Sequence, residues 1–214
     1  MSTRSVIILP DDSARPILDV IASAAKSLRV KMFVFSDPVL LDAVIGAHAR
    51  GVKVRVMLNP SRRSGEKENA ATRKALEKAG VEVNDTNPEF GVTHEKSMVV
   101  DDAKAFIKSL NWATENLTET RDYAIITDHP HEVAEVIEGF EADWHRRRFT
   151  PGEDSRLIWC RGNGRERVVE VAAAADRRER FEGEKRARLA SGVLGLDMYR
   201  MREPLAQAGL RYID

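Results

Sequence analysis

Four polar residues at two short spacings form a group that could act on a phosphate ester. His94 and Lys96 are two positions apart in a segment with a strand pattern, and Ser109 and Asn111 are two apart near the end of the next one. Side chains two positions apart on a strand project from the same face of a sheet. A hairpin between the two segments would therefore present an imidazole, an ammonium, a hydroxyl and an amide together.

This combination of groups suits a phosphate diester. A neutral imidazole can attack phosphorus as a nucleophile. An ammonium and an amide N–H can hydrogen-bond to the equatorial phosphate oxygens, whose negative charge grows in the transition state. The four residues therefore favour phosphodiester chemistry.

The elements that must position this group alternate between strand and helix over the first 150 residues. Alternation of this kind predicts an α/β sandwich with a mixed sheet. Short apolar runs predict strands at 6–9, 30–35, 52–58 and 81–83, followed by three more within 94–111 and 121–127. Apolar residues at helical spacing predict helices at 13–28, 38–50, 70–79 and 130–148.

The helix at 38–50 has the clearest boundaries in the sequence. Ser36 or Asp37 can accept a hydrogen bond from the first turn as the N-cap residue. Pro38 suits the first helical position, where its missing N–H costs nothing. Gly51 then ends the helix, because glycine readily adopts the left-handed conformation that follows a helix.

A domain boundary is expected at Pro151, between a catalytic domain, residues 1–150, and a C-terminal segment, residues 151–214. Residues 157–175 resemble the opening strand and helix of the chain at an offset of 150 residues, as at the start of a repeat. The match then stops, because residues 176–190 are a dense run of charge. Either the C-terminal segment is a truncated second repeat, or the short match arose by chance.

The composition limits the partners of the chain. Lys and Arg total 34, as do Asp and Glu, so there is no global positive field to attract nucleic acid or an anionic membrane. Cys160 is the single cysteine, which excludes an intramolecular disulfide and fits a reducing compartment. The apolar run at 6–9 is too short for a signal peptide or a membrane span. We therefore expect a cytoplasmic protein.

The spacing of the polar residues resembles the signature of the phospholipase D superfamily, which is HxKxxxxD followed by GSxN. The matching positions here are His94, Lys96 and Asp101, then, after six residues, Lys108, Ser109, Leu110 and Asn111. The flanking patterns also agree over roughly the first 148 residues. Lys108 is the one departure, since the family usually has glycine there. Its side chain would either narrow the pocket or add a positive contact.

The resemblance implies a role for each matching residue. His94 would be the nucleophile that forms a phosphohistidine. Lys96 and Asn111 would bind the phosphate, and Ser109 would lie in the same pocket. These roles describe a phosphodiester hydrolase or a phosphatidyltransferase of the phospholipase D type.

Two acids complete the expected site, and no metal or other cofactor is expected. By the same resemblance, Asp101 would support the local fold. An acid shortly after the motif often orients the histidine in this family, and Asp122 is the candidate here. His129 and His131 flank a proline at a helix start without a nearby cluster of Cys or carboxylate ligands, so a solvated helix end is expected there rather than a metal site.

The family builds its site from two such motifs, and the second histidine protonates the leaving group. None of the other four histidines is followed two residues later by lysine, so this chain carries half a site. A homodimer could supply the other half, because a two-fold axis can bring His94 of both copies together. The alternative is a catalytically incomplete remnant of a two-motif enzyme.

Phospholipid is the favoured substrate, with an activity like that of phospholipase D or cardiolipin synthase and transient contact with a membrane surface. The alternative activity is that of a dimeric, metal-independent endonuclease. A nuclease must hold a polyanion, and the balanced charge of this chain provides no obvious track for one. The substrate is therefore expected to be a phosphodiester, with phospholipid ahead of nucleic acid.

Overall fold

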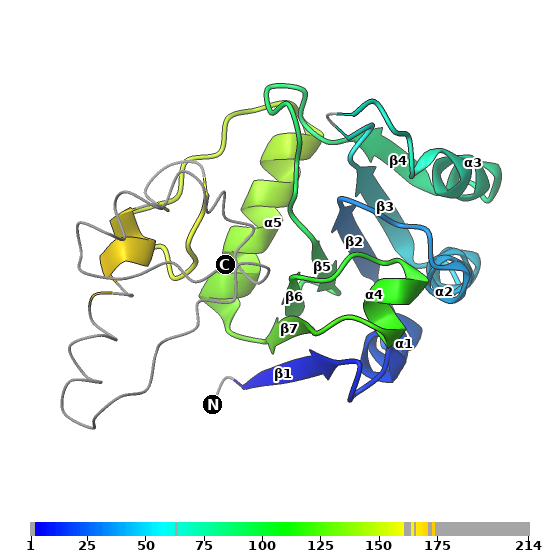
Figure 1. Cartoon of the computed structure of the whole chain (residues 1–214), viewed down its shortest axis with the longest axis horizontal. Helices are drawn as coiled ribbons and strands as arrows, with labels where there is room; N and C mark the ends of the chain where they lie inside the picture. The colour runs from blue at the N-terminus through cyan, green and yellow to red at the C-terminus, as the bar shows by residue number, and fades with distance from the viewer. Residues whose placement is uncertain (1–2, 63, 161–163, 165, 171–172, 174–214) are drawn as a thin grey trace. The chain divides into compact units, whose positions relative to one another are not determined.

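The computed structural model describes residues 3–62, 64–160, 164, 166–170 and 173 of the chain. The chain divides into two compact units, Met1–Phe149 and Thr150–Asp214. The strands and helices labelled in Figure 1 all lie in the first unit. The residues of the expected site are also in this unit.

A mixed sheet of seven strands runs through the first unit. The strands are β1 Arg4–Leu9, β2 Ser27–Met32, β3 Lys53–Leu58, β4 Glu82–Asp85, β5 Ser97–Val100, β6 Lys104–Lys108 and β7 Asp122–Thr127. Their order across the sheet is β1-β7-β6-β5-β2-β3-β4. β2, β3 and β4 are parallel, whereas the pairs from β2 through β5, β6 and β7 to β1 are antiparallel. The predicted mixed sheet is confirmed.

Helices cover both faces of this sheet. They are α1 Arg15–Ser23, α2 Pro38–Ala49, α3 Ala70–Lys78, α4 Thr114–Thr118 and α5 Pro130–Trp144. Figure 1 shows α1, α2 and α3 on one side of the sheet and α5 on the other. The main hydrophobic core joins the sheet to α1 and α2, and its buried members include Ile17, Ile21, Leu28, Val30, Met32, Leu40 and Val44.

Both ends of α2 follow the sequence prediction. The side chain of Asp37 accepts a hydrogen bond from the backbone N–H of Leu40 at 2.9 Å, so Asp37 is the N-cap residue. Pro38 occupies the first turn. Gly51 adopts a φ of 92° just beyond the helix, in the left-handed region that favours glycine. Local capping chemistry was therefore sufficient to predict this element.

The helix predicted at 13–28 is too long, because α1 ends at Ser23 and Leu28 belongs to β2. The carboxylate of Asp101 explains the difference. It accepts hydrogen bonds at 2.7–2.9 Å from three consecutive N–H groups in the loop after α1. Those N–H groups are consequently not available to continue the helix.

The strand predicted at 30–35 is displaced, because β2 begins at Ser27 and ends at Met32. Just after β2, the buried side chain of Asn69 binds backbone groups of Phe33 and Phe35. It accepts a hydrogen bond from Phe35 N and donates one to Phe33 O, each at 2.8 Å. Helix α4 was not predicted from the sequence.

The second unit does not open with the predicted strand. Residues 151–160 contain no strand, whereas residues 164, 166–170 and 173 are helical. Side chains bind backbone carbonyl oxygens there. Ser155 Oγ donates to Leu157 O at 2.9 Å, and the Arg167 guanidinium donates to Ser155 O at 2.6 Å. Several matched positions of the proposed repeat and the whole charge run at 176–190 lie outside the described residues.

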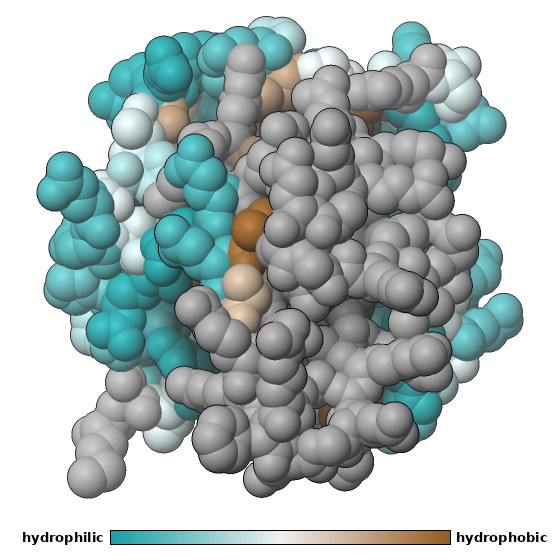
Figure 2. Space-filling view, turned by 60° about the vertical axis from the view of Figure 1, so that its left-hand side comes forward, coloured by the Kyte–Doolittle hydropathy of each residue, from teal (hydrophilic) through white to brown (hydrophobic). Residues whose placement is uncertain are grey.

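Large hydrophobic side chains are seldom exposed in the described part of the chain. Those that are exposed are Val6 and Ile8 on the edge strand β1, and Val39 in the first turn of α2. The described residues visible in Figure 2 are mostly hydrophilic, with small hydrophobic areas between them. No helix among the described residues is long and apolar enough to cross a membrane.

Candidate active site

His94 and Lys96 lie in an irregular segment immediately before β5, rather than on a strand as predicted. They are nevertheless close together. The Lys96 Nζ lies 3.1 Å from Nδ1 and 3.2 Å from Nε2 of His94. It also donates a hydrogen bond to the backbone carbonyl of His94 at 2.8 Å. The His94 side chain remains partly exposed and packs on Phe33, with ring centroids 4.6 Å apart.

The surroundings of His94 favour its uncharged form. Burial, followed by the positive charges of Lys96 and Arg62, lowers the pKa of His94 from 6.5 to about 4. The imidazole is therefore neutral at neutral pH and keeps one nitrogen lone pair for attack on an electrophile.

Lys96 is buried and remains mostly charged near neutral pH. Burial lowers the pKa of Lys96 from 10.5 to about 8, and the carboxylate of Asp122 acts in the opposite direction. The Nζ also lies 5.3 Å from the centre of the Phe33 ring, within the range of a cation–π interaction. Lys96 thus places a partly desolvated positive charge beside a neutral imidazole.

The β5–β6 hairpin brings the second half of the motif beside the first. Its turn contains Asp101 and Asp102, with φ values of 53° and 55°, which fits the tight turns that match the twist of paired strands. At the open end, Lys108 N donates to Lys96 O at 3.0 Å, so the pairing continues beyond β5. The hairpin therefore sets Lys96 opposite Lys108.

Asn111 follows β6 and is held by the backbone of its neighbour. Trp112 N donates to Val34 O at 3.0 Å, and Trp112 O accepts hydrogen bonds from Ser36 N at 2.7 Å and Asp37 N at 2.8 Å. These bonds fix the loop against the segment between β2 and α2. The side-chain oxygen of Asn111 is buried and has no hydrogen-bond partner among the described residues.

Ser109 and Asp122 form a separate hydrogen-bonded group. Ser109 Oγ donates to Asp122 Oδ1 at 2.6 Å. The other oxygen of Asp122 accepts hydrogen bonds from Thr120 Oγ1 at 2.6 Å and Asn116 Nδ2 at 3.2 Å. Within the described residues, the carboxylate of Asp122 makes no hydrogen bond to His94. The structure thus brings Asp122 to Ser109 and near the charge of Lys96, and does not place it to orient the histidine directly.

Asp101 lies at the far end of β5 from Lys96 and serves the fold. Its carboxylate accepts hydrogen bonds from the N–H groups of Ala25, Lys26 and Ser27. Burial opposes ionisation, but these three donors outweigh it and lower the pKa of Asp101. Asp101 therefore ties the hairpin turn to the loop between α1 and β2.

Three residues that the sequence analysis did not select also position the site. Glu95, between His94 and Lys96, binds Lys31 Nζ at 2.9 Å. Lys31 is fully buried and binds Asp143 of α5 at 2.8 Å. One signal was present in the sequence, because a lysine stands in the middle of the apolar run of β2.

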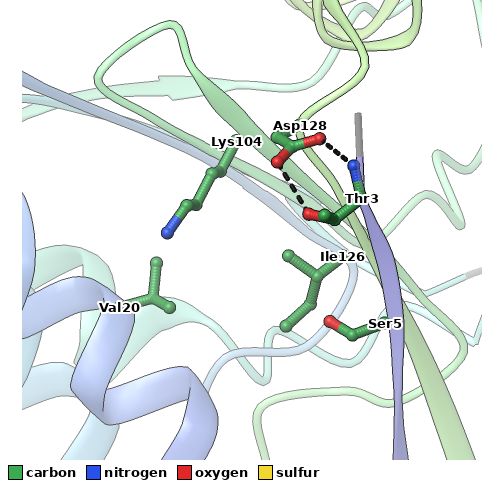
Figure 3. Close-up of a pocket in the computed structure, with 6 residues that line it drawn as sticks. All are labelled: Thr3, Ser5, Val20, Lys104, Ile126 and Asp128. Carbon is green, nitrogen blue, oxygen red and sulfur yellow. Dashed lines mark hydrogen bonds between the residues drawn. The ribbon is translucent and has the colours of Figure 1, made fainter. Parts of the chain in front are cut away.

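The pocket drawn in Figure 3 is a different place. It is lined by Thr3, Ser5, Val20, Lys104, Ile126 and Asp128. Asp128 there accepts hydrogen bonds from Thr3 N at 2.5 Å and Thr3 Oγ1 at 2.7 Å. None of the expected site residues lines this pocket. The described residues contain no group of three or more His, Cys, Asp or Glu side chains that could hold a metal ion.

Comparison with known proteins assigns the chain to a family. The family model described as "Cardiolipin synthase, PLD-like domain" matches residues 17–144, which is more than half of the chain. The chain therefore belongs to the phospholipase D-like family.

Similar proteins agree with this assignment. Human mitochondrial cardiolipin hydrolase is 34% identical over 136 residues, which cover 63% of this chain and 51% of that protein. Phospholipase D of Rickettsia conorii is 29% identical over 140 residues, which cover 65% of this chain and 66% of that protein. The match thus spans about half the length of the human relative.

Two solved structures share this fold. Nuc from Salmonella typhimurium, described as a phospholipase D family member, superposes with a TM-score of 0.62 at 23% identity, over 69% of this chain and 97% of Nuc. NucT from Helicobacter pylori gives a TM-score of 0.58 at 18% identity, over 68% and 98%. The predicted fold class is confirmed.

Proposed function

We propose that this chain is a phosphodiesterase of the phospholipase D type that acts through a covalent phosphohistidine on His94. The observation that carries the proposal is the pairing of a neutral, partly exposed imidazole with a buried ammonium 3.1 Å away. Membership of the family and relatives named cardiolipin hydrolase and phospholipase D support the same chemistry.

In the proposed reaction, a ring nitrogen of His94 attacks phosphorus. A P–N bond forms while the P–O bond to the leaving alcohol breaks, and a second acid gives the alcohol oxygen its proton. Water then attacks phosphorus, loses a proton to the same acid, now acting as a base, and releases His94. An acceptor alcohol in place of water would give phosphatidyl transfer. Lys96 and the Asn111 amide stabilise the negative charge on the equatorial oxygens.

We assign the second acid to His94 of another copy of the chain, which takes up a proton from solvent as the anionic substrate binds, because a nearby negative charge raises the pKa of an imidazole. The motivation is that the full sequence contains one HxK motif, and a two-fold axis would bring two copies of it together. Co-expression of differently tagged wild-type and His94→Ala chains in equal amounts tests this assignment. A shared site should leave about one quarter of the wild-type activity, whereas independent sites would leave about one half.

A phospholipid is the proposed substrate, and transient contact with a membrane surface in the cytoplasm is the proposed setting. The balanced charge of the chain and the names of its relatives support this class. Vesicles that contain phosphatidylglycerol or cardiolipin should be turned over faster than single-stranded DNA. Rapid DNA cleavage without action on either lipid would replace this proposal with the endonuclease.

The central test of the function is hydrolysis of bis(p-nitrophenyl) phosphate by His94→Ala. Activity should fall to background with an unchanged melting temperature, because the nucleophile has been removed. His131→Ala, which changes an exposed histidine of α5, is the matched control and should remain active. The wild type and His131→Ala should also remain active in EDTA, since the imidazole of His94 supplies the nucleophile and the ammonium of Lys96 supplies the positive charge. A well-folded His94→Ala protein with normal activity would refute the proposal.

A further inference from the structure

Buried polar atoms without a hydrogen-bond partner are concentrated around the candidate site. In the described part of the chain there are six such side-chain atoms. Four of them belong to the segments that the β5–β6 hairpin brings together: Thr93 Oγ1, Lys108 Nζ, Asn111 Oδ1 and Trp112 Nε1. Nearly all buried polar groups in folded proteins are paired. Their concentration here indicates a place built for a polar ligand.

Lys108 has the most costly of these atoms. Its side chain is only 4% exposed, and its Nζ lies 4.2 Å from the centre of the Trp112 ring without a hydrogen-bond partner among the described residues. Burial of an unpaired ammonium is strongly unfavourable. An apolar side chain at this position would fold more easily, so the packing of the core does not explain the lysine.

The strand register sets Lys108 against Lys96. Ser97 pairs with Ile107, and the bond from Lys108 N to Lys96 O continues the same register by one residue. Lys96 and Lys108 therefore project from the same face of the hairpin as direct cross-strand neighbours. Like charges in such a pair destabilise the sheet. An anion bound between them would remove this repulsion.

The charge state of Lys108 in the free protein fits this arrangement. Burial, followed by the positive charge of Lys96, lowers the pKa of Lys108 well below 10.5, and Glu95 is the one carboxylate that acts in the opposite direction. Lys31 shows the contrast: burial opposes its charge too, yet Glu95 and Asp143 raise its pKa. In the free protein the Nζ of Lys108 rests over the Trp112 ring.

We propose that Lys108 is a second phosphate-binding residue, which takes up a proton when an anionic substrate enters and then faces the phosphate together with Lys96. The inference rests on the proposed function and extends it. The ligand class is an oxyanion with the charge of a phosphodiester or more. The proton comes from solvent, and no covalent bond other than the N–H bond is formed or broken.

Calorimetry with sulfate tests the proposal, because sulfate stays a dianion near neutral pH and contributes no proton of its own. Titration of the full chain at pH 7.5 in two buffers of different ionisation enthalpy gives both the affinity and the protons taken up. The Lys108→Met variant should take up about one proton fewer than the wild type and bind sulfate about tenfold more weakly. Lys104→Met is the matched control, because Lys104 is an exposed lysine on the same strand and face.

Equal affinity and equal proton uptake in the wild type and Lys108→Met would overturn the proposal. So would the same losses in Lys104→Met, which would show a diffuse effect of charge. Lys108→Met should also melt at a higher temperature than the wild type, since it removes an unpaired buried amine.

A second measurement, the NMR resonance of the Lys108 side chain, uses the wild-type chain and does not depend on a variant that folds. In the wild-type chain with labelled lysines, the Lys108 side-chain resonance should move from the position of an amine to that of an ammonium as sulfate is added. A resonance that reports an ammonium before sulfate, or one that does not move, would overturn the proposal. Neither measurement needs turnover. Sulfate binding through Lys108 in a protein without activity would refute the proposed function and leave this inference standing.

Discussion

Buried charged side chains form ion pairs at one place in the first unit and lack ion pairs at another. On the face of the sheet that α5 covers, Lys31 pairs with Glu95 and Asp143. On the same face, Glu141 of α5 accepts hydrogen bonds from the guanidinium groups of Arg29 on β2 and Arg55 on β3. At the open end of the β5–β6 hairpin, by contrast, Lys96 and Lys108 are buried opposite each other, and neither is ion-paired within the described residues.

The difference separates charges that hold the fold from charges that await a ligand. A buried charge that is paired and hydrogen-bonded is satisfied within the protein. Two buried lysines without a carboxylate partner are satisfied only when an anion arrives. Glu95 joins the two places, because it stands between His94 and Lys96 in the chain and binds Lys31 beneath them. The paired network thereby fixes the segment that carries the nucleophile.

The largest expected effect is on stability, from Lys31→Met. Removal of this ammonium leaves Asp143 and Glu95 without their shared partner, and should lower the free energy of unfolding by about 4 kcal/mol. Urea denaturation measures the loss. Lys53→Met, at an exposed position of β3, is the control and should change little. The double variant Lys31→Met/Asp143→Leu should recover part of the loss, and no recovery would show that the pair is not the cause.

Lys96→Met should give a slightly smaller effect, on activity instead of stability. Loss of the charge beside His94 should reduce kcat for bis(p-nitrophenyl) phosphate by about 100- to 1,000-fold. The melting temperature should not fall, because the substitution leaves no carboxylate without its ion-pair partner. A variant that melts at a much lower temperature than the wild type would show that Lys96 stabilises the fold as Lys31 does.

Glu141→Gln should cost about 2 kcal/mol of stability near neutral pH, through weaker hydrogen bonds to Arg29 and Arg55. Burial opposes ionisation, but the hydrogen bonds and charges of Arg55 and Arg29 lower the pKa of Glu141 from 4.5 to about 2. The stabilisation is therefore complete above pH 4.5 and is lost as the pH falls through about 2. Denaturation curves of both proteins between pH 7 and 2 should converge at the acid end, and a constant difference would contradict the assignment.

The smallest effect is expected from Arg62→Gln, in the loop that approaches His94. Burial and Lys96 account for more of the lowered pKa of His94 than Arg62 does. Arg62 is also partly exposed and bonded to Glu68. The acid limb of kcat/KM, which lies near pH 4 in the wild type because His94 must be neutral, should therefore move upward by about half a pH unit. A shift to lower pH would show that His94 is not the titrating group.

The sequence predicts best where the physics is local. The cap at Asp37 and the glycine after α2 depend on residues within one helical turn, and both were found. The ends of α1 and β2 were misplaced because distant side chains decide them. Asp101 takes the N–H groups after α1, and Asn69 takes backbone groups after β2. No pattern within either segment reports those bonds.

In the site, too, local spacing was informative and contacts between distant segments were not predicted. The spacing predicted that His94 and Lys96 lie together beside the GSxN-like segment, and the structure places the Lys96 Nζ against the His94 ring and Lys108 opposite Lys96. That Ser109 and Asn111 share this pocket stays a prediction. The sequence did not reveal that Asp122 binds Ser109, nor that Lys31 of β2 binds Glu95. Those contacts depend on how strands far apart in the chain are paired. The burial of Lys108 likewise became visible only with the cross-strand register.

His94 should form a covalent bond to phosphorus during turnover, and this bond can be trapped. The wild-type chain is mixed with bis(p-nitrophenyl) phosphate, quenched within milliseconds in alkaline denaturant, where a P–N bond survives, and digested for mass spectrometry. The account predicts a p-nitrophenyl phosphoryl group on His94, formed at the rate of the first release of p-nitrophenol and absent from His94→Ala. Turnover without any adduct, or an adduct on a different residue, would contradict it.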